Sequence, residues 1–374
     1  MISFKSNKLQ HFPAQTLPDR TRWLILTDNQ LTQLPDDMGR LYRLQKLALA
    51  GNKLTSLPAS MANCQRLELA RLSANAFVDL PNWLFGLPKL SWLAIDGNPL
   101  NTQAGEFSVK ASHLTTSIPL IKLEDIALEE VIGQGASGII YRAKWRKQPH
   151  QLAGSGEQIA VKIFKGEVTS DGYPSNELEN CLQAGHHDNL IKVIGQINQA
   201  DGLGLVMELI PNQYANLGLP PSLKTCTRDT FHIDAKHNLT TILLMLQQMA
   251  SGLTHLHHQH VSHGDIYAHN TMYNPDAAIL FGDFGAATDL NKLPSQQREA
   301  MQRIEVRAFG CLMEDLLEHC CHFSAQELDQ IYQATKENLV ALKGDCLQKN
   351  LALRPQFSAI NQQLQQLISQ LDIG

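Results

Sequence analysis

An asparagine recurs at nearly constant spacing through the first hundred residues of this 374-residue chain. Asn29, Asn52, Asn75 and Asn98 follow Asn7 at intervals of 22, 23, 23 and 23 residues. Large apolar residues stand at fixed distances from each one, in the frame Leu-x-Leu-x-x-Asn-x-Leu-x-x-Leu-Pro. A unit this short cannot bury its apolar face alone, whereas stacked copies complete a common core. The sequence therefore predicts a stack of short strands at the N-terminus.

The period and frame of residues 1–100 resemble the leucine-rich repeat family. The resemblance implies an α/β solenoid whose concave strand face binds a protein partner. Trp23 and Trp92 precede equivalent strands, and either partner contact or cover for the repeat core would explain them. Small or weakly charged residues dominate the two concave rows, unlike a binding hot spot. These rows are Ser3, Ile25, Ala48, Arg71 and Ala94, and Lys5, Thr27, Ala50, Ser73 and Asp96.

No capping repeat follows the last asparagine, and residues 101–120 are rich in Ser, Thr and Ala. We interpret this stretch as a linker, and the next domain, residues 121–374, could cover the open end of the stack.

Composition excludes several classes of protein. The net charge is −5 and charged residues make up 18% of the chain, so no basic patch for nucleic acid or for a membrane surface stands out. The N-terminus lacks the apolar run of a signal peptide. Seven cysteines without framework spacing are typical of reduced, packed thiols. We therefore expect a cytoplasmic protein.

A glycine-rich string, Gly-x-Gly-x-x-Gly, occupies residues 133–138. Dinucleotide-binding folds use the same string, but there the glycines open a helix. Here the β-branched and aromatic run Ile139 to Tyr141 follows, which favours a second strand. A strand–glycine turn–strand is the flap that covers nucleotide phosphates in protein kinases.

The remaining parts follow in the order of the protein-kinase family, which residues 121–374 resemble. The resemblance implies that Lys162, in Ile-Ala-Val-Lys, contacts the α- and β-phosphates, and that Glu177, favoured over Glu179, pairs with it. Residues 206–210 resemble the hinge, with Met207 as gatekeeper. The implied nucleotide-binding residues are Ile132, Gly133, Gly135, Gly138, Ile140, Ala160, Lys162, Glu208, Ile210 and Met272.

The chemical centre resembles the family's catalytic loop, His-Gly-Asp-Ile-Tyr-Ala-His-Asn at residues 263–270, followed by Asp-Phe-Gly at 283–285. By resemblance, Asp265 orients the attacking hydroxyl, and Asn270 and Asp283 bind Mg²⁺ that bridges the ATP phosphates. Phosphoryl transfer depends mainly on positioning and charge neutralisation, which these groups supply.

Four departures from the family pattern stand out. Gly264 replaces the arginine that receives an activation-loop phosphate, so we expect activity to be independent of phosphorylation there. Tyr267 replaces a lysine, and His269 or Lys292 could compensate. Only about twenty residues separate Gly285 from 305–310, which resembles a later helix start, so the peptide-docking segment is short or absent. Finally, Arg354 lacks its usual glutamate partner.

The prediction is thus an α/β leucine-rich-repeat solenoid followed by an α+β two-lobed kinase domain of a bacterial, cytoplasmic type. It would be an ATP- and Mg²⁺-dependent protein serine/threonine kinase, with a protein substrate or partner bound through the repeats. Two alternatives remain: a small-molecule kinase of the aminoglycoside or choline type, and an ATP-binding pseudokinase scaffold. A metal site in the histidine-rich run 255–263 is disfavoured, because no closed ligand set is evident.

Overall fold

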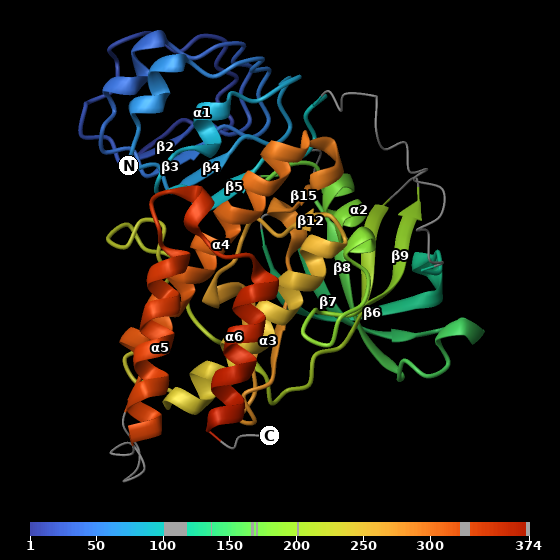
Figure 1. The fold of residues 1–374 in the computed structure, drawn as a ribbon. Coiled ribbons are helices and arrows are strands. Elements are labelled where there is room, and N and C mark those ends of the chain that lie inside the picture. Colours follow the sequence, from blue (N-terminus) through green and yellow to red (C-terminus); the bar gives the residue numbers. More distant parts are fainter. Residues whose placement is uncertain are drawn as a thin grey trace.

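The computed structural model describes residues 1–100, 118–135, 137–165, 168–169, 171–199, 202–321 and 330–371. An N-terminal β-rich region packs beside a part with two lobes, one built around a sheet and one mainly helical (Figure 1). Most of the predicted linker, residues 101–117, lies outside the described residues. Within the described part, no helix is both long enough and apolar enough to cross a bilayer.

The N-terminal region is a parallel five-stranded sheet whose strands follow chain order. Its asparagines explain the repeat period. Asn52 donates from Nδ2 to the carbonyls of Leu26 and Leu49 (2.9 and 2.8 Å) and accepts from the Leu31 N–H (3.1 Å). One side chain thus satisfies backbone groups of two successive repeats, which buried backbone requires. The strands are β1 (Ile2–Ser3), β2 (Trp23–Ile25), β3 (Lys46–Ala48), β4 (Leu69–Arg71) and β5 (Trp92–Ala94).

Short helical turns return the chain on the side opposite the strands. Each begins directly after the proline of the repeat frame, which caps the turn and, having no N–H, cannot continue the ladder of a strand. Met38, Met61 and Leu84 point into the core from these turns and are at most 2% exposed. The turns are η1 (Asp36–Arg40), η2 (Ala59–Asn63) and α1 (Asn82–Phe85).

The smaller lobe is an antiparallel sheet of order β6-β7-β8-β10-β9 with one helix, α2. Gly138 lets β7 approach β8 closely, because a Cβ there would lie 2.5 Å from the Ile163 carbonyl oxygen. Its elements are β6 (Ile126–Gln134), β7 (Gly138–Trp145), β8 (Gln158–Phe164), α2 (Pro174–Ala184), β9 (Val193–Gln199) and β10 (Gly202–Glu208).

The larger lobe is built on α3, whose first turn is capped by the Asn238 side chain (2.7 Å to the Thr241 N–H). Its helices are α3 (Leu239–His258), α4 (Ser295–Glu318), α5 (Gln330–Cys346) and α6 (Phe357–Gln370). Two small sheets carry the loops between them: β11 (Ala215–Asn216), β13 (Thr271–Tyr273) and β14 (Ile279–Phe281), and β12 (Val261–Ser262) with β15 (Thr288–Asp289). Single 3-10 turns lie at η3 (Leu123–Asp125), η4 (His150–Leu152), η5 (Ala268–Asn270), η6 (Phe284–Ala286), η7 (Leu290–Lys292) and η9 (Leu351–Leu353).

The repeat region and the larger lobe share their cores. Ala300, Met301 and Ile304 of α4 are buried among the repeat leucines, together with two residues just ahead of the helix. Leu69 and Trp92 of the repeat strands belong in turn to the core of the larger lobe. Figure 1 shows α4 (orange) running beside the end of the blue repeat sheet. The next domain thus covers the open end of the repeats, and exposed apolar surface there is avoided.

This docking also corrects an expectation about α4. The residues resembling a helix start, 305–310, lie inside the helix, which begins ten residues earlier at Ser295. Its first turns occupy the positions just ahead of 305–310, where the resemblance implied a short or absent peptide-docking segment. They are helical because the repeats bury their apolar face, and tertiary packing supplies most of a helix's stability.

Candidate functional site

The phosphate-binding lysine of the resemblance lies on the central strand β8. Its ammonium group forms an ion pair with Glu177 of α2 and lies 3.6 Å from Asp283. Burial would lower the pKa of Lys162, but the carboxylates of Asp283 and Glu177 outweigh it and raise the pKa. Glu179 faces solvent, so of the two candidate glutamates the structure brings Glu177 to the lysine.

The glycine flap has two kinds of glycine. A Cβ on Gly135 would meet no atom within 4 Å, and one on Gly133 would meet only the Ile140 side chain at 3.4 Å. Packing within the protein therefore does not demand glycine at these positions, unlike Gly138. Bare backbone at an open turn is what close approach of a phosphate group requires. The flap residues thus fit a nucleotide.

The residues predicted to contact adenine come from the sheet of the smaller lobe, from the chain that follows β10, and from one strand of the larger lobe. Ala160 and Met207 are register partners on β8 and β10. Ile140 is the register partner of Lys162, and Met272 lies on β13 of the other lobe. Glu208 ends β10 and Ile210 follows it, where the chain crosses to the larger lobe, while Ile132 on β6 is 43% exposed. Apolar side chains from two lobes are suited to enclose a flat base.

The catalytic-loop residues are held by one another. His263 Nε2 lies 2.9 Å from the Gly282 carbonyl, and its Nδ1 accepts from the Asp265 N–H at 3.3 Å. A ring protonated on Nε2 satisfies both contacts. Asn270 donates from Nδ2 to the carbonyl and to Oδ2 of Asp265, at 3.1 and 3.0 Å. The loop therefore presents the Asp265 carboxylate in a fixed orientation.

Asp283 has the properties of a metal ligand. Its backbone is left-handed (φ 66°), a conformation that aspartate tolerates, and 54% of its side chain is exposed. Partial burial would raise its pKa, but the charge of Lys162 outweighs this and holds the pKa below the ordinary 3.8. The accessible Asp283 carboxylate offers oxygen ligands of the kind that Mg²⁺ prefers, and the Asn270 amide oxygen, whose amide nitrogen binds Asp265, offers another. The donor set therefore fits a divalent metal bound with nucleotide phosphates.

Sequence reasoning missed one residue that reaches this centre from the repeats. Arg71 of β4 donates to Asp265 Oδ1 (2.5 Å), to the Gly264 carbonyl (3.2 Å) and to Asp171 Oδ1 (2.7 Å). The signal was present, because Arg71 is the single charged residue in its concave row. The small residues around it are unlike a hot spot for an outside partner, whereas Arg71 contacts another part of the same chain.

Both tryptophans in question contact the kinase part. Trp92 is 2% exposed, stacks on Tyr267 (centroids 4.6 Å apart, planes at 5°) and donates to the Ile266 carbonyl (3.0 Å). Trp23 donates to the sulfur of Cys226. Tyr267, which replaces the family's lysine, is thus explained by packing: its ring joins the catalytic loop to the repeats.

Gly264 is explained by the backbone. Its φ is +73°, and a Cβ there would lie 2.2 Å from the Ala286 carbonyl oxygen. No other residue fits without movement. The Gly264 N–H donates to Glu305 of α4 (2.7 Å), which also contacts His257 (2.8 Å). The tight approach of the following segment therefore accounts for the missing arginine.

The two cations proposed to compensate for Tyr267 point elsewhere. Lys292 forms an ion pair with Asp96 of the repeats (2.5 Å), and His269 pairs with Asp229 (2.6 Å). Asp96 also accepts from Asn180 of α2 (2.9 Å). Through Asp96 the repeats thus contact α2, the helix that carries Glu177. Within the described residues, neither Lys292 nor His269 forms an ion pair with Asp265.

The His269–Asp229 pair predicts a pH dependence of stability. Burial would lower the pKa of His269, but the hydrogen bond and charge of Asp229 outweigh it and raise the pKa above 6.5. The imidazolium therefore stabilises the fold fully below pH 6.5, and this contribution is lost as pH rises through the folded pKa. In urea titrations, the unfolding free energy of His269→Gln should therefore approach that of the wild type as the pH rises above 6.5. A difference in unfolding free energy between His269→Gln and the wild type that grows as pH rises would contradict the pairing. Replacement of the exposed His258 by glutamine is the control for the loss of an imidazole ring.

Arg354 found other partners in place of its usual glutamate. Its buried guanidinium donates to the carbonyls of Gln348 (2.8 Å), Arg303 (3.0 Å) and Pro88 (3.1 Å). Burial, and then the charge of Arg307, lower its pKa to about 10. Because Pro88 belongs to the repeats, this arginine also joins the two parts of the chain.

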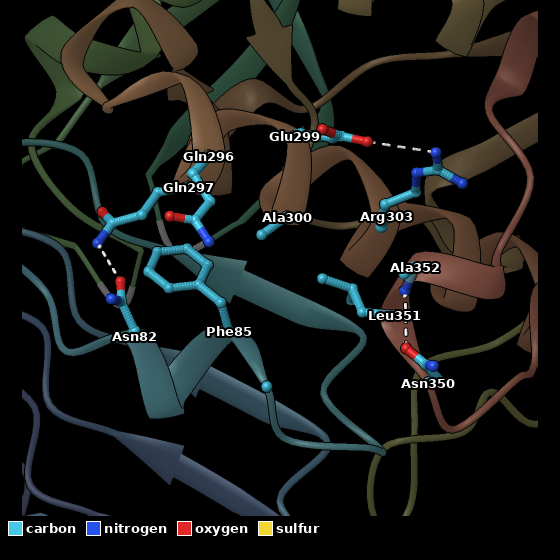
Figure 2. Close-up of a pocket in the computed structure, with 11 residues that line it drawn as sticks. Asn82, Phe85, Gln296, Gln297, Glu299, Ala300, Arg303, Asn350, Leu351 and Ala352 are labelled. Carbon is cyan, nitrogen blue, oxygen red and sulfur yellow. Dashed lines mark hydrogen bonds and ion pairs between the residues drawn. The ribbon is translucent and has the colours of Figure 1, made fainter.

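A surface hollow of about 330 Å³ lies on the same interface, away from the catalytic loop (Figure 2). Phe85 of the repeats and Ala300 of α4 line it, and Gln297 contacts Asn82 across its edge (3.2 Å). None of the predicted nucleotide-binding residues contributes to its walls.

Comparison with known proteins agrees with this geometry. The family model for protein tyrosine and serine/threonine kinases matches residues 126–320, just over half of the chain. The leucine rich repeat model matches residues 43–100. The chain belongs to the family of protein tyrosine and serine/threonine kinases, and its N-terminal region carries leucine-rich repeats.

Two relatives illustrate the match. The putative neurotrophin receptor LTRK 1 of Lymnaea stagnalis is 27% identical over 208 residues, which are 53% of this chain and 26% of that protein. Fibroblast growth factor receptor 1 of Xenopus laevis is 22% identical over 188 residues, 49% of this chain and 23% of that protein. The chain thus spans about a quarter of the length of either relative.

These relatives overturn one prediction. The expectation of a cytoplasmic location is wrong by this comparison, because both relatives are named as receptors. The expectation rested on charge, thiols and the N-terminus. Net charge, reduced thiols and the character of the N-terminus are properties of a folded domain, and they do not decide in which compartment the domain works. The family covers tyrosine as well as serine and threonine kinases, so the match does not choose the acceptor hydroxyl.

Proposed function

We propose that this protein is an ATP- and Mg²⁺-dependent protein kinase that transfers the γ-phosphate to a serine or threonine hydroxyl. One network of contacts carries the proposal: Lys162 pairs with Glu177 and lies 3.6 Å from Asp283, and Asn270 binds Asp265 at 3.0 Å. His263 joins the two groups, because it contacts the Gly282 carbonyl next to Asp283 (2.9 Å) and the Asp265 N–H (3.3 Å). This set supplies positive charge for phosphates, oxygen ligands for a metal and a carboxylate for the acceptor, as phosphoryl transfer requires. A pure scaffold needs none of these groups, which disfavours a pseudokinase.

In this proposal each residue has one task. Lys162 holds the α- and β-phosphates, and Glu177 keeps the lysine in place. The backbone of the flap from Gly133 to Gly138 covers the phosphates. Asn270 and Asp283 hold Mg²⁺, which supplies charge neutralisation when bound. Adenine lies between Ile132, Ile140, Ala160 and Met272 and meets the backbone of Glu208 and Ile210.

We also propose the division of the chain. Residues 1–100 form a leucine-rich-repeat solenoid, 101–120 a linker and 121–374 the catalytic domain. A protein partner of the repeats remains part of the proposal. The concave side of β4 and β5 already contacts the kinase part through Arg71 and Trp92, so the partner would use other surfaces of the repeats.

A small-molecule kinase is the second candidate, and one observation favours it. The segment that docks peptides in the family is replaced by the first turns of α4, which are committed to the repeats. A small alcohol needs no such platform, whereas a protein acceptor must then be held by another surface.

Incubation of the full chain with labelled ATP and Mg²⁺ tests the proposal. We expect label on serine or threonine, and a loss of on the order of 10²-fold or more in Asp265→Asn, which cannot accept the hydroxyl proton. Asp188→Asn, whose side chain is 96% exposed, is the matched control. Label on tyrosine would correct the acceptor. Equal rates in Asp265→Asn and the wild type would refute the assigned chemistry, and transfer only to added small alcohols would favour the second candidate.

A further inference from the structure

The strand that carries Arg71 is built to project a long side chain. Register pairs Arg71 with Ala48 on β3 and with Ala94 on β5. Both neighbours on the concave face are thus alanines, which leave room beside the arginine stem. The guanidinium reaches the catalytic loop instead of solvent, and the side chain is only 6% exposed.

The contacts of Arg71 join three segments of the chain. Nε binds Asp171 ahead of α2, Nη1 binds the Gly264 carbonyl, and Nη2 binds Oδ1 of Asp265. Planar guanidinium groups are suited to such multiple contacts, and lysine cannot reproduce them in full. Burial opposes the charge, but the carboxylates of Asp265 and Asp171 outweigh it and raise the pKa of Arg71. The group therefore stays cationic.

Asp265 is consequently held from both sides. Arg71 takes Oδ1, and the Asn270 amide takes Oδ2 at 3.0 Å. Each carboxylate oxygen has two lone pairs, so one acceptor site on each remains for a hydroxyl. The side chain is 20% exposed, which leaves it reachable.

The repeats are a fixed part of this arrangement. The shared cores with α4 and the stacking of Trp92 on Tyr267 hold Arg71 in place. A removable inhibitory module would not share its core with the enzyme it blocks, since separation would expose that apolar surface. The geometry therefore argues against a simple block of the active site.

We propose that Arg71 is a positioning residue for phosphoryl transfer, supplied by the repeats to a catalytic loop in which Gly264 and Tyr267 stand where the family has an arginine and a lysine. It holds the Asp265 carboxylate toward the acceptor. In the step, the acceptor oxygen forms a bond to the γ-phosphorus and the bond from this phosphorus to the bridging oxygen of ATP breaks. ADP leaves, and Asp265 takes the hydroxyl proton. The inference rests on the proposed kinase function.

The test uses the full chain with Arg71→Gln and Arg71→Lys. Arg307→Gln is the matched control, because Arg307 also binds a repeat carbonyl, that of Lys89 (3.2 Å). Its other side-chain hydrogen bond among the described residues is to the Leu347 carbonyl, away from the catalytic loop. We expect Arg71→Gln to lower kcat by about 10²–10³-fold, with KM for ATP within about 3-fold of the wild type. Arg71→Lys should recover at least about 10-fold of that loss, since it restores charge without the full fork. Arg307→Gln should keep kcat within about 3-fold.

Several outcomes decide the matter. A kcat in Arg71→Gln equal to or above that of the wild type overturns the inference and shows an inhibitory contact. Arg71→Lys no better than Arg71→Gln overturns it too, because packing alone would then explain the loss. If Arg71→Gln does not fold, Arg71→Lys decides: reduced kcat with unchanged KM supports the inference, and full activity rejects it. If the wild type itself shows no phosphoryl transfer, the proposed kinase function is refuted. The assay of the wild type alone distinguishes this outcome from failure of the inference about Arg71.

Discussion

Replacement of Asp283 by asparagine is expected to lower phosphoryl transfer by on the order of 10³-fold, because it removes a charge at the proposed metal site. The carboxylate is accessible, and its pKa is held below 3.8 beside Lys162, so it is fully ionised near neutral pH. Asparagine keeps the shape and loses that charge. The metal concentration needed for half-maximal activity should therefore rise as kcat falls.

Metal titrations of the wild type, Asp283→Asn and Asp276→Asn measure this. Asp276 lies exposed in the turn between β13 and β14, where its backbone N–H donates to Asn274 Oδ1 (3.0 Å). We expect Asp276→Asn to match the wild type. If the metal dependence of Asp283→Asn equals that of the wild type, Asp283 is not a metal ligand. Chelation of the metal should abolish the activity of the wild type.

Truncation of Ile304 to alanine is expected to destabilise the whole chain by about 2–5 kcal/mol, the usual cost of a cavity in a packed core. Ile304 is fully buried where α4 meets the repeat leucines. The two parts share this core, so they should unfold together. Fluorescence from tryptophans in the repeats and loss of helical circular dichroism should follow a single transition.

Glu299→Ala on the same helix is the matched control. Glu299 is exposed, and within the part of the chain that the structure describes its one ion pair is with Arg303 (3.3 Å), a surface contact worth about 0.3–0.5 kcal/mol. Chemical unfolding of the three proteins should separate the two substitutions clearly. Equal stability of Ile304→Ala and Glu299→Ala, or a repeat region that melts before the lobes, would show that the shared core does not couple them.

The repeat period was readable because each asparagine acts locally. Asn52 satisfies backbone groups of its own and the preceding repeat, so its position in the frame cannot vary. The order of the kinase motifs was readable for a similar reason. Lys162 on a strand and Asp265, Asn270 and Asp283 on short loops keep their spacing, because local backbone geometry places each one.

Two features of the site, Gly264 and Tyr267, were visible in the sequence only as departures from the family pattern. The sequence offered no reason for either. The structure explains both by neighbours distant in the chain: the Ala286 carbonyl lies against Gly264, and Trp92 stacks on Tyr267. A close approach between two segments can require one particular residue type, such as glycine, but the sequence does not show which other segment makes the contact.

The sequence by itself determined the two families and the stacking unit, and it predicted a set of charged groups for a nucleotide site, since these follow from local spacing and side-chain chemistry. Only the tertiary structure decided where the repeats sit. It turned the first turns of α4 into their cap, and it directed Lys292 to Asp96 and brought Arg71 to Asp265. Contacts of this kind join residues almost two hundred positions apart. They depend on how two apolar surfaces fit together, which no local pattern encodes.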